Sequence, residues 1–296
     1  MDKYNIIDTL CIGSGGVNGI SYLGALHHLI SIDYINLDKI KTYIGSSIGA
    51  LFSALIVLGY SVDELIDFIL NFNFEVLESD IDYDNVFINY GLCNNDKLKL
   101  MIEHFIKKKN YNTSITFSEL YIQTNKKLII TGTNITDSKI EYFDHINTPQ
   151  MTIVDAVRIS TCLPIIFFPI NYNGKYYVDG GVASNMPINI CNKITTLGIT
   201  AKYNLNIDSI LSVLLTCINM ALESQINNSD YNLIMIETVS SSVNLQLNKE
   251  DKIKLVDNGI NTAIQYINNN KQLIHNNKET QVDNEDIIKI ELNIII

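Results

Sequence analysis

The sequence lacks basic charge and long apolar runs, and these absences exclude several classes of protein. Its 296 residues carry 21 lysine and arginine side chains against 32 aspartates and glutamates, a formal net charge of −11. Such a surface argues against nucleic-acid partners, because backbone phosphates are bound by basic side chains. The apolar run 50–59 is too short for a membrane-spanning helix, which needs roughly 18 residues. We therefore expect neither a nucleic-acid partner nor a transmembrane helix.

Signatures of metal binding, disulfides and secretion are also missing. The five cysteines are odd in number and widely spaced, and there is no Cys-x-x-Cys pair and no His-Glu-x-x-His motif. The N-terminus, residues 1–5, lacks the basic-then-apolar layout of a signal peptide. We expect reduced, buried thiols, no metal, no cofactor and a cytoplasmic location, with peripheral contact to membranes left open. The cysteines are Cys11, Cys93, Cys162, Cys191 and Cys217.

What is present is an alternation of apolar strand patterns and amphipathic helix patterns, without a repeat or a Pro/Gly-rich hinge. This alternation predicts an α/β sandwich, most simply in one domain. Capping patterns at Ser61 and Thr116 indicate helix starts, and Asn173-Gly174 indicates a hairpin turn. The expected strands are 6–12, 128–134, 139–143, 165–170, 175–178, 233–239 and 287–295, and the expected helices include 20–29, 62–74, 96–106, 152–161, 209–223 and 251–269.

The pentapeptide Gly45-Ser46-Ser47-Ile48-Gly49 has the G-x-S-x-G spacing of a nucleophile elbow. It follows a short apolar strand pattern and opens the helical run 50–59, as such an elbow requires. The spacing selects Ser47 as the nucleophile, whereas Ser46 stands at the variable position and is expected to pack or hydrogen-bond locally. Gly45 and Gly49 would keep Cβ atoms from colliding where the backbone turns back.

A glycine-rich loop, residues 13–19, joins the first expected strand to a helix. As a dinucleotide fingerprint it is weak, because Ser14 occupies a position that the G-x-G-x-x-G register gives to glycine, and no Gly-Lys-Ser/Thr closes it as a phosphate loop. Its amides suit an oxyanion hole, with Gly15 and Gly16 as donors. A tight turn without chemistry remains the alternative.

A serine hydroxyl needs a partner that accepts its proton. Asp179 stands at the end of an expected strand and is followed by Gly180 and Gly181, where α/β enzymes place catalytic groups. A simple Asp-Gly hairpin turn is the alternative. No histidine occupies a motif position, and His145 is the candidate that a classical Ser-His triad would use.

Three stretches together resemble the patatin-like phospholipase family: the glycine loop, the elbow and Asp179-Gly180-Gly181. The segments 155–164 and 179–187 also resemble the family's "AvRaSsaiP" and "DGGvxxNxP" runs. The resemblance spans residues 6–190. It implies an α/β fold, a three-layer α/β/α sandwich with a central, mostly parallel sheet. Residues 6–190 would form the catalytic core, and residues 191–296 would add helices and strands packed on the same domain.

The resemblance further implies a lipid acyl hydrolase that uses a Ser–Asp dyad without histidine. Ser47 would attack the ester carbonyl, Asp179 would act as general base, and the amides of Gly15 and Gly16 would hold the oxyanion. The substrate would be a phospholipid, a lysophospholipid or an acylglycerol. Because a carboxylate with a pKa of about 3.9 is a weak base, we expect burial to raise the pKa of Asp179. The motif glycines that would support this site are Gly19, Gly45, Gly49, Gly180 and Gly181.

Two positions depart from the family's usual loop, Gly-Gly-Gly-x-Arg/Lys-Gly. Ser14 replaces the first glycine, and Asn18 replaces the basic residue. An alternative is therefore a catalytically weak or inactive lipid-binding relative. The apolar run 165–168 could contact a membrane, but burial in the core is the favoured interpretation.

Overall fold

The computed structural model of the chain describes residues 7–78, 81–202, 213, 216, 231–238 and 246–270. Its strands are β1 (Thr9–Ile12), β2 (Thr42–Gly45), β3 (Gly91–Cys93), β4 (Lys127–Asn134), β5 (Lys139–Phe143), β6 (Ile165–Phe167), β7 (Ile170–Tyr172), β8 (Lys175–Val178), β9 (Thr196–Lys202) and β10 (Asn232–Glu237). Its helices are α1 (Ile20–Ser31), α2 (Ile48–Val57), α3 (Val62–Asn71), α4 (Asn85–Asn89), α5 (Asp96–Lys108), α6 (Phe117–Thr124) and α7 (Ile153–Ser160). Residues 249–270 are also helical.

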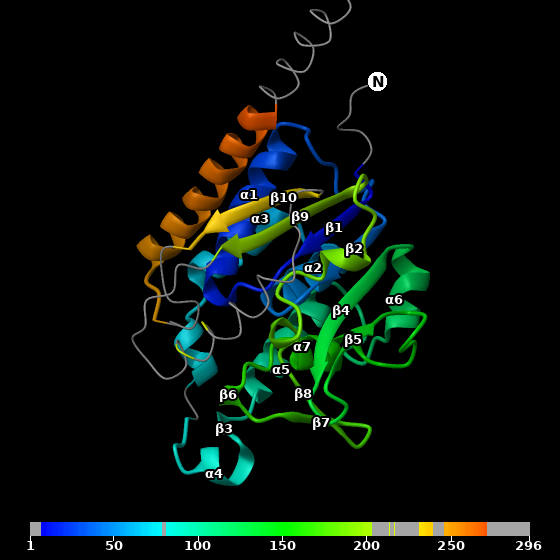
Figure 1. Ribbon diagram of the computed structural model, residues 1–296, viewed down its shortest axis with the longest axis vertical. Helices are drawn as coiled ribbons and strands as arrows, with labels where there is room; N and C mark the ends of the chain where they lie inside the picture. The colour runs from blue at the N-terminus through cyan, green and yellow to red at the C-terminus, as the bar shows by residue number, and fades with distance from the viewer. Residues whose placement is uncertain are drawn as a thin grey trace, which may run out of the picture.

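Among the described residues, one eight-stranded sheet organises the fold in the order β10-β9-β1-β2-β4-β8-β7, with β5 paired to β4 (Figure 1). The pairs from β10 through β4 are parallel, and the pairs of β4 with β5 and β8, and of β7 with β8, are antiparallel. Helices flank the sheet. The predicted α/β class with a central, mostly parallel sheet is confirmed.

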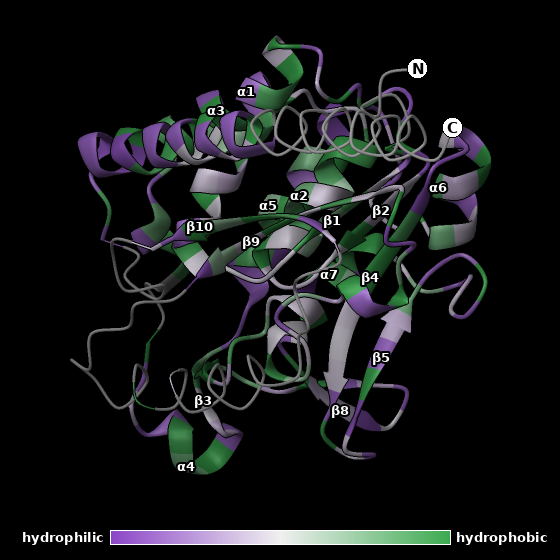
Figure 2. Cartoon of the chain, turned by 45° about the horizontal axis from the view of Figure 1, so that its top comes forward, coloured by the Kyte–Doolittle hydropathy of each residue, from purple (hydrophilic) through white to green (hydrophobic). Residues whose placement is uncertain are grey.

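Alternating side chains along the central strands divide the core between the two faces of the sheet. Leu10 and Ile12 of β1 belong to the large apolar cluster shared with α1, α2, α5 and α7, whereas Cys11 between them belongs to a smaller cluster with Met186 and Ile188. Figure 2 shows the hydrophobic colour concentrated on the strands and on α2 inside the fold. The long helix at residues 249–270 lies so close to α1 that a Cβ on Gly24 would meet the backbone carbonyl of Val256.

Local sequence signals account for several element ends. Ser61 and Thr116 each form a capping box, with Glu64 and Glu119 respectively, as the spacing predicts. The turn Asn173-Gly174 has φ values of 51° and 77°, the left-handed pair that a two-residue hairpin requires. The helix expected to reach residue 74 ends at Asn71, because Phe72 adopts an extended conformation, and a short 3-10 turn, η3 (Phe74–Glu78), follows.

Some elements differ from those that the sequence patterns predict, and some predicted elements lie outside the described residues. The strand β9, which lies between β1 and β10 in the sheet, has no counterpart among the predicted strands. The single strand predicted over 165–170 is divided between β6 and β7, and β6 pairs with β3 in a separate two-stranded sheet. The strand expected at 287–295 lies outside the described residues, and so does the helix expected at 209–223 apart from Val213 and Thr216. Of the helices described, none has the length and apolarity to cross a membrane.

Candidate active site

The elbow forms the turn between β2 and α2. Ser47 has φ 54° and ψ −124°, a conformation that side-chain-bearing residues rarely adopt. A Cβ on Gly45 would lie 2.5 Å from the nitrogen of Ala50, and one on Gly49 would meet the carbonyl oxygen of Ile12. Both glycines are therefore required by close backbone approach. The turn presents the Ser47 side chain at the N-terminal end of α2, where the helix carries partial positive charge.

Asp179 follows β8, beside the carboxyl end of β4. Its backbone is fixed on both sides: its amide donates to the carbonyl of Cys162 at 2.7 Å, and its carbonyl accepts from Thr133 Oγ1 at 2.8 Å. The two glycines that follow open a 3-10 turn, η4 (Gly180–Val182). There a Cβ on Gly180 would meet Thr131. The side chain is consequently held in one place within the fold.

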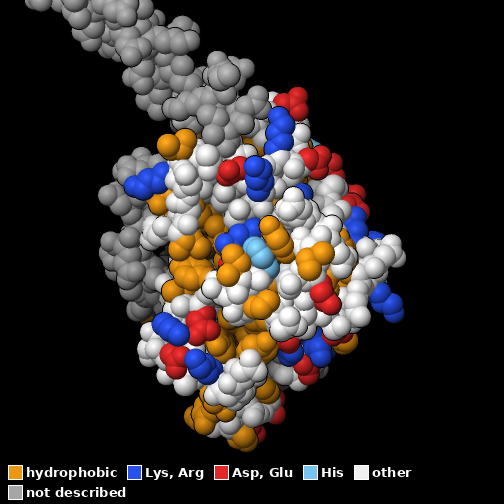
Figure 3. Space-filling model, turned by 90° about the vertical axis from the view of Figure 1, so that its right-hand side faces the viewer, with side chains coloured by type: hydrophobic (Ala, Val, Ile, Leu, Met, Phe, Trp, Pro, Cys, Tyr) orange, Lys and Arg blue, Asp and Glu red, His pale blue; other side chains and the backbone are white. Residues whose placement is uncertain are grey.

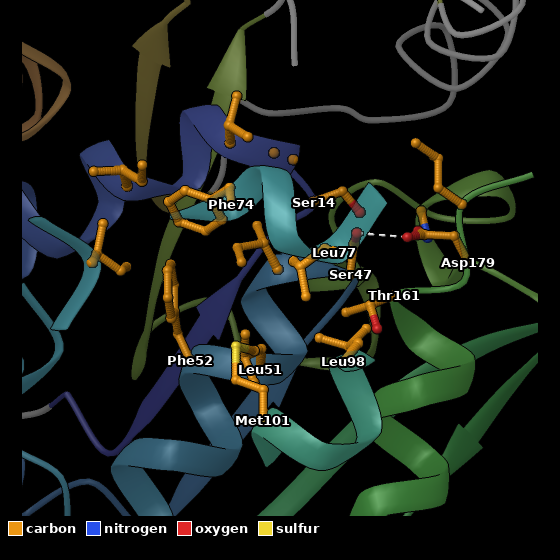
Figure 4. Close-up of a pocket in the computed structure, with 18 of the residues that line it drawn as sticks. Ser14, Ser47, Leu51, Phe52, Phe74, Leu77, Leu98, Met101, Thr161 and Asp179 are labelled. Atoms are coloured by element: carbon orange, nitrogen blue, oxygen red, sulfur yellow. Dashed lines mark hydrogen bonds between the residues drawn. The ribbon is translucent and has the colours of Figure 1, made fainter. Parts of the chain in front are cut away.

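The structure brings Ser47 and Asp179 together, although 132 residues separate them in sequence. The hydroxyl of Ser47 donates to Asp179 Oδ2 at 2.6 Å, and the amide of Gly181 donates to Oδ1 at 2.7 Å (Figure 4). Burial raises the pKa of Asp179 to about 7, because desolvation penalises the carboxylate more than these two hydrogen bonds stabilise it. A carboxyl group with this pKa can accept and return a proton near neutral pH.

The glycine loop lies across from this pair. Gly16 has φ 51°, which glycine adopts without strain, and it begins a 3-10 turn, η2 (Gly16–Gly19), that leads into α1. Gly15, Gly16, Ser47 and Asp179 line the same cavity. Asn18 is buried, so the position where the family resemblance expects a basic side chain is neutral and away from solvent.

The cavity has a volume of about 190 Å³, and the polar side chains that line it are Ser14, Ser47, Thr161, Asp179 and Asn185. Figure 4 shows Leu51, Phe52 and Met101 lying away from the Ser47–Asp179 hydrogen bond. Ser47, Leu51 and Leu55 are spaced by four residues along α2, so the cavity follows two turns of this helix, roughly 12 Å. The apolar wall comprises Val17, Ile20, Ile48, Leu51, Phe52, Leu55, Leu65, Phe68, Ile69, Phe74, Leu77, Leu98, Met101, Phe105, Leu163, Ile166, Phe167 and Val182.

Several residues that pattern analysis did not select support this arrangement. Ser160 of α7 accepts a hydrogen bond from the amide of Ser47 at 3.0 Å and so fixes the elbow from a third element. Thr133 also accepts from the amide of Ala183 at 3.1 Å, which ties the loop after Asp179 to β4. Ser160 lies in the segment 155–164 that resembles the family, which is the signal that could have drawn attention to it.

The histidines do not take part in this arrangement among the described residues. No histidine lines the cavity. His145 instead stacks on Tyr121, with ring centroids 3.8 Å apart, and His27 bonds Asp63; His275 lies outside the described residues. The four cysteines described are free thiols, three of them buried, and Cys217 is not described. No group of three His, Cys, Asp or Glu side chains in the described ranges is placed to hold a metal ion.

The apolar run at 165–168 also has a defined place. Phe167 is buried, and Ile166 and Phe167 both line the cavity. Ile165, Ile166 and Phe168 are only partly buried, so burial of the whole run remains a prediction.

Comparison with known proteins places the chain in one family. The profile described as Patatin-like phospholipase matches residues 10–191. Protein R571 of Acanthamoeba polyphaga mimivirus is 31% identical over 255 residues, 82% of this chain and 84% of its own length. The protein named "Probable lipid hydrolase 463L" of Invertebrate iridescent virus 6 is 34% identical over 215 residues, 67% of this chain and 73% of its own length.

Two solved structures share the fold. VipD from Legionella pneumophila aligns with a TM-score of 0.56 at 18% identity, over 89% of this chain and 67% of VipD. The type III effector ExoU aligns with a TM-score of 0.54 at 16% identity, over 89% of this chain and 53% of the ExoU chain.

Proposed function

The chain belongs to the patatin-like phospholipase family, and on this premise we propose that it is a lipid acyl hydrolase with a Ser47–Asp179 dyad. One observation carries the proposal: the hydrogen bond of 2.6 Å from the Ser47 hydroxyl to a buried carboxylate at one end of an apolar cavity. The raised pKa of Asp179 supports its role as the base. The relative named as a lipid hydrolase supports the class of substrate.

In the first half-reaction, Ser47 Oγ attacks the ester carbonyl carbon while Asp179 accepts the hydroxyl proton. Negative charge develops on the carbonyl oxygen, and the amides of Gly15 and Gly16 stabilise it, assisted by the N-terminal end of α2. The tetrahedral intermediate then expels the alcohol, which takes the proton from Asp179. The product of this step is an acyl-Ser47 ester.

In the second half-reaction, water replaces the alcohol. Asp179 accepts a proton from the water, whose oxygen attacks the acyl carbon, and the same amides hold the oxyanion. Collapse of this intermediate returns the proton to Ser47 Oγ and releases a fatty acid. Both proposed steps use only groups of the protein and water.

The cavity supports a lipid substrate. A length of roughly 12 Å approaches the ~15 Å depth of one bilayer leaflet, so a long acyl chain can lie along α2 with its ester at Ser47. The alcohol part would then point out of the cavity. Phospholipids, lysophospholipids and acylglycerols all have this layout.

The test compares wild type with Ser47→Ala and Asp179→Asn. Each protein is incubated with mixed phospholipid and neutral-lipid micelles, the products are identified by lipidomics, and a fluorophosphonate probe is used to label Ser47. We expect both variants to lose activity by a factor on the order of 10⁴ or more, and Ser47→Ala to lose labelling. Equal turnover in all three proteins would refute the proposal. A wild type that binds lipid but neither labels nor hydrolyses would establish the lipid-binding alternative.

We also propose peripheral contact with lipid aggregates through α4 and its flanks. Tyr83, Phe87, Ile88 and Tyr90 are at least 70% exposed, and Figure 3 shows hydrophobic side chains at the lower tip, the level at which Figure 1 draws α4. The chain enters this region from η3 and leaves it into β3, which pairs with β6, and both η3 and β6 line the cavity. Residues 72–96 contain no lysine or arginine, which favours neutral or zwitterionic lipid.

Flotation with phosphatidylcholine vesicles tests this contact. The double variant Phe87→Ser, Ile88→Ser should remain at the bottom of the gradient, whereas Ile122→Ser should float like wild type. Ile122 is a matched control because it is 77% exposed but lies on α6. Unchanged flotation of the double variant would rule out α4 as the contact.

We propose, finally, that residues 6–190 form the catalytic core and that residues 191–296 pack on the same domain. Support comes from β9, which lies beside β1 in the sheet, and from the helix at 249–270, which lies against α1. A chain truncated after residue 190 should therefore expose a central strand edge and aggregate. Size-exclusion chromatography of the truncated chain tests this.

A further inference from the structure

Ser14, the residue by which the glycine loop departs from its family, is held at three points. Its amide donates to the carbonyl of Asn185 at 2.7 Å, its carbonyl accepts from the Tyr22 hydroxyl at 2.5 Å, and its own hydroxyl donates to Ser46 Oγ at 3.0 Å. The first two bonds use only backbone atoms of Ser14 and would persist with any residue there except proline. The third exists only because position 14 is a serine.

The bond to Ser46 is part of a relay of two hydrogen bonds. Ser46 Oγ donates its single proton to the carbonyl of Ser184 at 3.0 Å and therefore accepts from Ser14. Ser46 is fully buried, and Ser14 is nearly so although it also lines the cavity. The relay joins three loops: the one after β1, the elbow after β2 and the one after β8.

The first two residues of the relay, Ser14 and Ser46, each adjoin a proposed catalytic group. Ser14 immediately precedes Gly15 and Gly16, and Ser46 immediately precedes Ser47. The third loop contains Gly181, whose amide donates to Asp179, and a Cβ on Gly181 would meet Ser14 Oγ. The Ser14 hydroxyl therefore lies between the oxyanion donors, the nucleophile and the base without being bonded to Ser47 or Asp179.

We infer that the Ser14 hydroxyl is a positioning group that fixes the amides of Gly15 and Gly16 relative to Ser47. The inference rests on the proposed hydrolase function and deepens it. Displacement by about 1 Å can cost up to 10²-fold in rate, and losing one oxyanion donor costs on the order of 10²–10³. Removing a hydroxyl that restrains the donors should cost less, because the backbone bonds of Ser14 remain.

The experiment measures kcat and KM on a long-chain 4-nitrophenyl ester presented in detergent micelles for wild type, Ser14→Ala, Ser46→Ala, the double variant and Ser14→Thr. The melting temperature and the rate of fluorophosphonate labelling are recorded for each protein. Ser53→Ala is the matched control. Ser53 is a fully buried serine of α2 that makes only a long 3.4 Å bond to the carbonyl of Ile44 and does not line the cavity.

We expect Ser14→Ala and Ser46→Ala each to lower kcat about tenfold with KM changed less than about twofold. Because Ser46→Ala already removes both bonds of the relay, the double variant should be no slower than Ser46→Ala. Ser14→Thr keeps the hydroxyl and should recover most of the rate. Ser53→Ala should retain wild-type kcat, and kcat should not follow melting temperature across the set.

Three outcomes would overturn the inference: wild-type kcat in Ser14→Ala, losses that multiply in the double variant, or losses that follow melting temperature and include Ser53→Ala. If Ser14→Ala does not fold, the inference is tested by comparing kcat with melting temperature in Ser46→Ala and Ser14→Thr. A wild type without turnover or labelling would refute the hydrolase function itself. Turnover in wild type with no effect at Ser14 would refute the positioning role alone.

Discussion

The two ends of the cavity are built by different physical means. The end at Ser47 is formed by turns at the carboxyl edge of the sheet and is held by directional hydrogen bonds and by glycines without room for a methyl group. The far end is formed by apolar side chains of α2, α3 and α5, which make only non-directional contacts. Almost any substitution at the Ser47 end should lower activity. Substitutions at the far end should alter substrate specificity before they abolish activity.

The largest difference between the two ends is expected when one methyl group is added at the elbow. In Gly45→Ala the new Cβ would lie 2.5 Å from Ala50 N and Ala50 Cα, so the turn that presents Ser47 must move. We expect kcat to fall by a factor on the order of 10² or more, measured with the 4-nitrophenyl ester. Leu55→Ala, which removes a larger group at the far end, should keep fluorophosphonate labelling even though the cavity it leaves lowers stability. Loss of fluorophosphonate labelling in Leu55→Ala as well as in Gly45→Ala would contradict the expected difference between the two ends of the cavity.

The pH dependence of kcat/KM tests the role of Asp179 at the Ser47 end of the cavity. Because Asp179 must be deprotonated to accept a proton and its pKa is about 7, kcat/KM on a neutral ester should rise with pH. It should level off above pH 7 and fall about tenfold for each pH unit below it. A midpoint near pH 4, the value of an exposed carboxyl group, would show that Asp179 is not the base. Stopped assays between pH 4.5 and 9 supply the profile.

Filling the far end should alter which acyl chain is accepted. Leu55→Phe places a larger side chain two helical turns from Ser47, where the end of a long acyl chain would lie. We expect the ratio of kcat/KM for palmitoyl over butyryl esters to fall by about tenfold or more, with butyryl turnover retained. An unchanged ratio would mean that the chain takes another path.

The buried carboxyl group should also have a cost in stability. Native Asp179 retains its proton up to about pH 7, whereas an unfolded aspartate loses it near pH 3.9, so stability falls as pH rises between these values. Asp179→Asn has no proton to release. Its melting temperature should therefore exceed that of wild type at pH 8 by about 2–4 °C for each kcal/mol gained, and the difference should vanish near pH 4. A variant less stable than wild type at pH 8 would contradict this.

The smallest effect is expected at His145, which tests the classical-triad alternative. His145 stacks on Tyr121 and does not line the cavity. His145→Ala should therefore change kcat/KM by less than about twofold. Loss of turnover in a folded variant would restore the histidine mechanism and remove Asp179 as sole base.

Short-range signals in the sequence were sufficient for much of the fold. Ser61 and Thr116 cap helices through residues three positions away, and Asn173-Gly174 closes a hairpin by its own backbone preferences. By contrast, β9 was not predicted, because a central parallel strand is buried on both faces and lacks the alternation of apolar and polar residues. The pairing of β3 with β6 joins residues more than 70 positions apart, and no local pattern specifies it.

The sequence by itself determined the chemical groups of the site: a serine in an elbow that only glycines permit, an aspartate before two glycines, and a glycine-rich loop before a helix. Tertiary structure alone decided that these groups meet, that Ser160 and Ser184 hold the elbow, and that the carboxyl group of Asp179 is dry enough for its pKa to reach about 7. The physical reason is the separation along the chain over which each interaction acts. Steric limits of a turn act over a few residues, whereas hydrogen bonds between loops and the loss of water depend on how the whole chain packs.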